Sequence, residues 1–93
     1  LYTIKEFLYS VGGIILRHFT VQFRSLRDVQ DFVALASKLP RKLLVGSERF
    51  QVHATSFMGM FALNCRKPLR VTVDCSEEEF RQIRVLFERF LVA

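Results

Sequence analysis

The spacing of apolar residues changes period at Ser25, and this change constrains the fold more than any other feature of the sequence. Residues 19–24 (FTVQFR) carry an apolar side chain at every second position, which predicts a strand with one buried face. Residues 26–38 carry apolar side chains at helical spacing, which predicts an amphipathic helix that ends before Pro40. Ser25 is therefore expected to cap this helix, with Asp28 three residues later near the positive end of the helix dipole.

The middle of the chain predicts a hairpin and then a short helix. Residues 42–46 (KLLVG) and 49–54 (RFQVHA) are expected to form two strands joined by a tight turn over residues 46–48. Along the second strand, Phe50 is expected to share one side with Val52 and Ala54. Residues 57–63 then predict a short and very apolar helix, with Asn64 in a left-handed conformation at its C-cap.

The last part of the chain predicts a strand and a capped helix. Pro68 marks the turn into residues 69–75 (LRVTVDC), which alternate between apolar and polar side chains. Ser76 and Glu79 form the S-x-x-E pattern of a capping box. The helix that follows is expected to bury one apolar stripe, formed by Phe80, Ile83, Phe87, Phe90 and Leu91.

The predicted order from Phe19 is strand, helix, strand, strand, helix, strand, helix, which is typical of an α+β open-faced sandwich. Residues 1–16 fit this order poorly and are expected to form an accessory segment before a domain over residues 17–93. A helix over residues 3–11 is expected there, whereas residues 14–18 would extend the first strand. The apolar run in this segment is shorter than the roughly 20 residues that a membrane-spanning helix needs.

Composition limits the classes of function. The formal net charge is +5 and the pI is about 9.8, so the chain attracts acidic partners, although scattered cations also describe an ordinary solvated surface. Cys65 and Cys75 are ten residues apart without a CxxC motif, which predicts neither a zinc site nor a disulfide scaffold. We therefore expect a reducing, cytoplasmic setting, no metal and no cofactor.

The element order, joined to the segment ATSFMGMFAL at residues 54–63, resembles HPr, the histidine phosphocarrier family of the bacterial sugar phosphotransferase system. The residues that match the family's pattern there are Ser56, Phe57, Met58, Gly59 and Leu63, while Thr55 replaces the usual lysine. ALASK at residues 34–38 resembles the end of the family's first helix. The resemblance implies an HPr-like βαββαβα fold, with a four-stranded antiparallel sheet and the helices on one face.

The same register places the family's active turn on FRSLRDV at residues 23–29. Ser25 then falls on the phosphoacceptor histidine, Arg27 on the arginine that helps to hold the phosphoryl group, and Asp28 on the proline that starts the helix. A carrier needs an imidazole that titrates near neutrality, whereas a serine phosphate is a stable ester. Asp28 is also expected to cancel part of the charge of Arg27. The resemblance therefore argues against phosphocarrier activity, and no enzyme is predicted.

Two serines mark candidate anion sites. Arg24, Ser25 and Arg27 are candidate phosphate-binding residues, because the free N–H groups at a helix start attract anions. The resemblance implies that Ser56 corresponds to a regulatory serine, which a dedicated kinase phosphorylates in many Gram-positive bacteria. The competing interpretation of both serines is an ordinary N-cap.

Other candidates lie on the short helix and on the strands. The resemblance implies that the exposed part of the helix with Phe57, Met58 and Phe61 docks partner proteins, for which methionine is well suited. Met58 is the best candidate for exposure, whereas Phe57 and Phe61 are also expected in the core. His18 and His53 are expected to be solvated, lone histidines on the polar sides of strands.

Three functions stay open. The first is a regulatory, protein-binding module that contacts phosphotransferase-system proteins or an HPr kinase through Arg27, Ser56 and Met58. The alternative is a basic nucleic-acid-binding domain, against which the strands show neither an exposed aromatic pair nor a GXXG loop. A carrier that uses another residue is the least favoured.

Overall fold

The structure, a computed structural model, describes residues 10–11 and 14–92 of the chain. Its elements follow the predicted order from Phe19 onward. In chain order they are β1 (Ser10–Val11), β2 (Ile14–Val21), α1 (Leu26–Ala36), β3 (Leu43–Gly46), β4 (Gln51–His53), α2 (Phe57–Phe61), β5 (Leu69–Asp74), α3 (Glu77–Leu86) and the 3-10 helix η2 (Glu88–Phe90).

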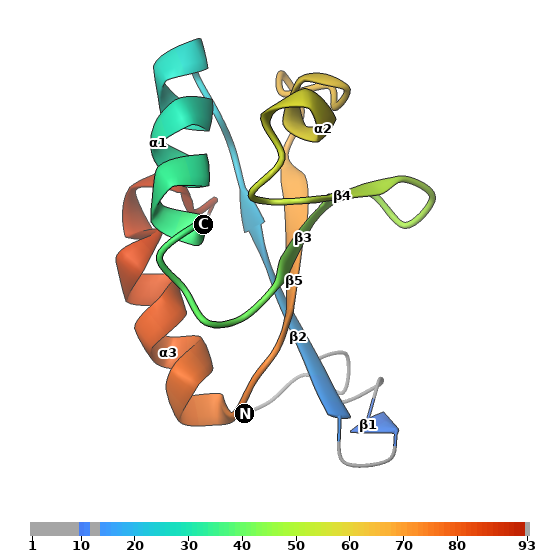
Figure 1. The fold of residues 1–93 in the computed structure, drawn as a ribbon, viewed down its shortest axis with the longest axis vertical. Coiled ribbons are helices and arrows are strands. Elements are labelled where there is room, and N and C mark those ends of the chain that lie inside the picture. Colours follow the sequence, from blue (N-terminus) through green and yellow to red (C-terminus); the bar gives the residue numbers. More distant parts are fainter. Residues whose placement is uncertain (1–9, 12–13, 93) are drawn as a thin grey trace.

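Four antiparallel strands form the main sheet in the order β2-β5-β3-β4, and the short strand β1 pairs with the outer edge of β2. Helices α1 and α3 both cover one face of this sheet, with α1 above α3 in this view, and α2 lies near one end of the strands (Figure 1). The predicted α+β open-faced sandwich is therefore confirmed, with a two-residue strand added at its edge.

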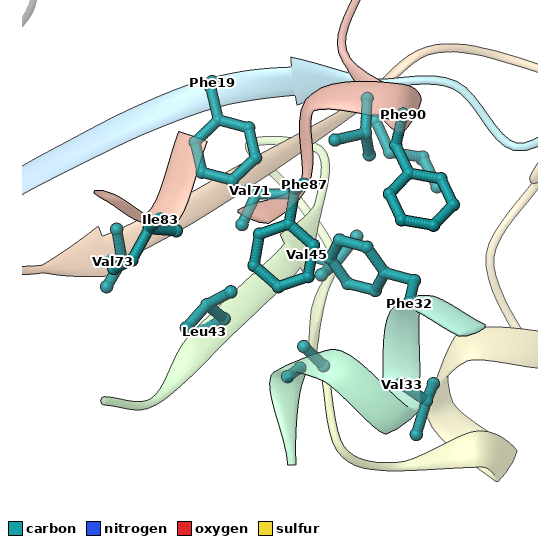
Figure 2. Packing of buried hydrophobic residues seen from close by; sticks show 14 of the residues in the cluster. Phe19, Phe32, Val33, Leu43, Val45, Val71, Val73, Ile83, Phe87 and Phe90 are labelled. Carbon is teal, nitrogen blue, oxygen red and sulfur yellow. The ribbon is translucent and has the colours of Figure 1, made fainter. Parts of the chain in front are cut away.

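The core is built from the alternating strand residues and a cluster of phenylalanines from the helices (Figure 2). Val45, Val71 and Phe32 are fully buried, and the Phe32 ring meets the ring of Phe87 with centroids 4.7 Å apart. The inward alternation predicted for the first strand is also confirmed, because Phe23 is buried although it lies beyond the end of β2. Apolar periodicity was therefore sufficient to identify most of the core.

The prediction of a helix over residues 3–11 is wrong for its last two residues. Ser10 and Val11 form β1, in register with Ile15 and Ile14 of β2. The rest of that expected helix lies outside the described residues. β2 begins at Ile14, so the expectation that residues 14–18 extend the first strand is confirmed.

The hairpin is confirmed, but its loop is longer than predicted and leaves Phe50 outside the core. Strand β4 begins at Gln51, and the Phe50 side chain is 51% exposed. Gly46 adopts a φ of 152°, which glycine tolerates far better than other residues. The Ser47 N–H donates to the Phe50 carbonyl at 2.9 Å, and the Ser47 hydroxyl accepts from the Phe50 N–H at 3.3 Å. These bonds close a polar turn before β4, so Phe50 does not continue the side on which Ala54 is buried.

The short helix ends earlier than predicted. Helix α2 stops at Phe61, with Ala62 as its C-cap in the right-handed region. Among the described residues only Gly46 has a positive φ, so the left-handed conformation expected at Asn64 is wrong. The Asn64 side chain instead accepts a hydrogen bond from the Arg66 N–H at 3.2 Å, which stabilises the following turn.

The C-terminal segment completes the outer edge of β2. Leu91 forms an antiparallel bridge with Val21, and the Gln22 N–H donates to the Phe90 carbonyl at 2.9 Å. The Val92 N–H donates to the Thr20 carbonyl at 3.0 Å. The end of the chain is therefore joined to its first long strand.

The predicted capping box at the start of α3 is confirmed. The Ser76 hydroxyl accepts from the Glu79 N–H, and the Glu79 carboxylate accepts from the Ser76 N–H, both at 3.2 Å. Arg41 adds two bonds of 2.9 Å to the same carboxylate. The Arg41 guanidinium first, and then the Ser76 N–H, lower the pKa of Glu79 from 4.5 to about 2.

This bonding predicts that Glu79 contributes to stability in a pH-dependent way. A carboxyl group whose pKa is depressed by folding stabilises the native state above its unfolded pKa, and this contribution is lost as the pH falls toward the folded pKa. Wild type is therefore expected to melt at a higher temperature than Glu79→Gln at neutral pH. This difference in melting temperature should disappear as the pH falls from 4.5 to about 2.

Thermal melts followed by circular dichroism across this pH range test the prediction. Glu78→Gln is the matched control, because Glu78 lies in the same helical turn with an exposed side chain. A gap of constant size down to pH 2, or one of equal size in Glu78→Gln, would contradict the assignment.

Candidate functional site

Ser25 caps α1, as predicted from the sequence. Its backbone is extended, with φ −156° and ψ 167°, and its hydroxyl accepts from the Asp28 N–H at 3.2 Å. The Asp28 carboxylate accepts from the Arg24 N–H at 3.0 Å. Asp28 thus satisfies a backbone donor just before the helix, as the acid of a capping box does. The exposed hydroxyl at the predicted phosphoacceptor position is engaged in holding the helix start.

The charge of Asp28 is compensated from the far end of the chain. Arg89 in η2 donates to Asp28 at 2.6 Å and to Asp31 at 3.0 Å. The Arg24 N–H first, and then the Arg89 guanidinium, lower the pKa of Asp28. Arg27 forms its ion pair with Asp31 at 3.4 Å. The sequence predicts that Asp28 offsets part of the charge of Arg27. In the structure Arg89 pairs with both Asp28 and Asp31 instead, and Arg27 pairs with Asp31.

A shallow groove of about 400 Å³ connects the start of α1 with the end of α2. It brings together three of the predicted candidates, Arg24, Ser25 and Phe61, while Arg27 is not among its lining residues. No acidic side chain of the described residues lines it, and Arg66 adds a second cation that the sequence analysis did not single out. The complete lining is Phe23, Arg24, Ser25, Leu26, Val29, Phe61, Leu63, Asn64, Cys65 and Arg66.

Helix α2 exposes most of its apolar side chains. Met58 is 81% exposed, as anticipated, whereas the expectation that Phe57 and Phe61 lie in the core is wrong, since they are 43% and 53% exposed. A helix of five residues can bury only one face, and here that face carries the fully buried Met60 and Gly59. A Cβ on Gly59 would lie 2.9 Å from the Cβ of Val52, so the helix packs closely against β4.

Ser56 caps α2, as the N-cap interpretation of this serine predicts. Its hydroxyl accepts from the Gly59 N–H at 3.0 Å, and the residue is exposed. The two exposed phenylalanines beside it stack with ring centroids 6.2 Å apart. Helices α1 and α2 contact each other, so Ser25, Ser56 and the exposed apolar residues share one end of the molecule.

The two histidine side chains lie on the face of the sheet opposite the helices. His53 is exposed, as expected, whereas His18 is half-buried rather than solvated. In the register, His18 pairs with Thr72 and His53 pairs with Leu44, so Thr72 and Leu44 separate the two histidines across the sheet. Both residues line a groove of about 550 Å³ on this face.

The thiols of Cys65 and Cys75 are both free, and burial raises the pKa of each. Cys65 lines the groove beside Ser25, and its thiol donates to the Met60 carbonyl at 3.7 Å. In the part of the chain that the structure describes, no helix is both long and apolar enough to cross a membrane.

Comparison with solved structures decides the fold. The crystal structure of the phosphocarrier protein HPr from Bacillus anthracis str. Ames superposes with a TM-score of 0.61 at 18% sequence identity, over 85% of this chain and 99% of that one. The chain has the HPr fold. No protein-family model matches the sequence, and no curated protein matches it either. The likeness to HPr is therefore one of three-dimensional structure, with Ser25 at the start of the first HPr-type helix.

Proposed function

We propose that the chain is a protein-binding module built on the HPr fold that does not carry phosphoryl groups. The observation that carries the proposal is the residue at the start of α1. Ser25 stands where the sequence resemblance places the phosphoacceptor histidine, and its hydroxyl is bonded to the Asp28 N–H. Serine offers no imidazole for a labile phosphoramidate, and a phosphate ester on Ser25 would not be passed on.

The binding face that we propose consists of the groove beside Ser25 and the exposed side of α2. Its apolar anchors are Leu26, Phe57, Met58 and Phe61, each between 43% and 81% exposed. Methionine adapts its shape to a partner, and aromatic side chains contribute strongly to binding energy. Arg24 and Arg66 line the groove, and none of its lining residues is acidic, which favours a partner that carries acidic residues around an apolar pocket.

Ser56 adds a possible point of regulation within the same proposal. It is exposed beside the anchors, and phosphate on its hydroxyl would replace the bond to the Gly59 N–H with a negative charge next to the apolar surface. A kinase of the HPr kinase type is the proposed modifying enzyme, and the modification would weaken docking of an acidic partner.

A phosphotransfer assay tests the first half of the proposal. Incubation with enzyme I and radiolabelled phosphoenolpyruvate is expected to leave this protein unlabelled, while a histidine-bearing HPr in the same tube becomes labelled. The physical reason is the absence of an imidazole at residue 25. Acid-labile, base-stable label on either histidine of this chain would overturn the proposal.

A binding assay tests the second half. Purified enzyme I, titrated by calorimetry, is the probe, and Met58→Glu is expected to weaken its binding by about tenfold or more, since interface anchors contribute about 1–2 kcal/mol or more. Val85→Glu is the matched control, because Val85 is 70% exposed on α3. Equal effects of the two variants, or no binding by wild type, would count against docking on a phosphotransferase-system protein.

A further inference from the structure

A second groove, of about 620 Å³, lies on the other side of the α2–β5 connection from Ser25. One wall is the β3–β4 loop, residues 46–50, and the other is the segment of residues 62–70. Leu63 and Asn64 line both this groove and the one beside Ser25, so the two are separated by that connection. Its volume lies within the range of about 300–1,000 Å³ that is usual for ligand sites.

This groove has an exposed aromatic ring. Phe50 is half exposed and belongs to the loop, where the Ser47 hydroxyl holds the Phe50 N–H at 3.3 Å and the Ser47 N–H holds its carbonyl at 2.9 Å. These bonds fix the backbone position from which the ring projects. The strands that the structure describes carry no exposed aromatic pair and the sequence has no GXXG loop, which disfavours nucleic acid, but the structure adds one exposed ring in the loop before β4.

Cationic side chains line the same groove as the ring. Arg49, Lys67 and Arg70 line the groove, against one acidic residue, Glu48. Arg70 is paired with Glu48 at 3.5 Å, whereas no ion pair is recorded for Arg49 or Lys67 within residues 10–11 and 14–92. The groove therefore has an excess of positive charge next to a flat apolar surface.

The groove continues onto the open face of the sheet. Glu48 and Arg70 also line the 550 Å³ groove on that face, which adds the cation Lys42, the acid Asp74 and the hydrogen-bonding side chains of Gln51 and Thr72. A track that passes from an aromatic ring along several cations and hydrogen-bonding side chains fits an extended polyanion better than a single small ligand.

We propose that this track binds single-stranded nucleic acid, with one base stacked on Phe50 and backbone phosphates on the surrounding cations. Every base has a face that can stack on an aromatic ring, while arginine and lysine neutralise phosphates. An acidic peptide would use the cations but gains nothing comparable from the ring. The track shares no charged or aromatic residue with the protein-binding face proposed above, so each proposal can be tested independently of the other.

Fluorescence anisotropy with the full chain and a labelled single strand of about 12 nucleotides tests this proposal. Binding is expected to weaken steeply between about 50 and 200 mM salt. Phe50→Ala is expected to weaken it by roughly five- to hundredfold, as the loss of one stacked base does. Arg49→Glu combined with Lys67→Glu should reduce both the affinity and the slope against salt.

Two controls separate stacking from general charge. Phe61→Ala removes an equally exposed phenylalanine from the other groove, and Arg84→Glu reverses a cation on α3. Both are expected to bind nearly as wild type does. Absence of binding at low salt overturns the proposal, and so does equal weakening by Phe50→Ala and Phe61→Ala. Binding of a polyglutamate chain that matches the oligonucleotide and is insensitive to Phe50→Ala would assign the track to acidic peptides instead.

Discussion

Replacing Phe32 by alanine is expected to lower the free energy of unfolding by about 3–5 kcal/mol, the usual cost of removing a buried phenylalanine. Phe32 is fully buried on α1, and its ring meets those of Phe23, Phe87 and Phe90 at centroid distances of 5.1, 4.7 and 5.6 Å. The change leaves a cavity where α1 joins the C-terminal segment. Because small domains are stable by only about 5–15 kcal/mol, the variant should be close to its unfolding threshold.

Equilibrium unfolding in urea measures this loss as a shift of the midpoint. Val85→Ala is the control, since Val85 is 70% exposed on α3 and its truncation should change stability by less than about 0.5 kcal/mol. A loss below about 1 kcal/mol in Phe32→Ala would mean that the aromatic cluster is not packed as described.

Replacing Gly46 by alanine is expected to cost about 3 kcal/mol, for two reasons that act together. Its φ of 152° lies in a region that residues with a side chain rarely adopt. A Cβ at this position would also overlap the carbonyl oxygen of Phe50, which belongs to the backbone and has little room to move. The β3–β4 loop must therefore rearrange, and Phe50 would lose its defined position.

Urea unfolding again provides the measurement, and Glu48→Gln is the control in the same loop. Glu48 is largely exposed, and its ion pair with Arg70 contributes at most about 1 kcal/mol. If Gly46→Ala proved as stable as wild type, the turn geometry described for residues 46–50 would be wrong. The same variant should also bind single-stranded nucleic acid more weakly, because the loop that it disrupts carries Phe50.

Local signals in the sequence were sufficient for the elements and their caps. Ser25, Ser56 and Ser76 all cap helices as predicted, because a capping hydroxyl bonds to an N–H three residues away. The alternation of residues 69–75 likewise places Val71 and Val73 in the core. Such features depend on neighbours in the chain and can be read directly from spacing.

The errors at Phe50 and Asn64 come from local turns, whereas other errors concern side chains whose surroundings come from distant parts of the chain. Phe57 and Phe61 resemble core residues in sequence, but a five-residue helix that packs close to β4 through Gly59 has no second face to bury. Arg89 lies about sixty residues from Asp28 and Asp31, and no local pattern indicates that it neutralises them. The groove beside Ser25 depends in the same way on a contact between α1 and α2.

The pairing of strands has a consequence for how the chain folds during synthesis. The central strand β5 pairs with both β2 and β3, and Leu91 bridges to Val21 of β2, so among the described strands only the short β1–β2 pairing and the β3–β4 hairpin are local. Contacts between residues far apart in sequence slow folding, because loop entropy is lost before they form. On a ribosome β2 therefore stays unpaired along its β5 side until residues 69–74 have emerged. The domain is expected to fold in one late and cooperative step, with no stable half preceding it.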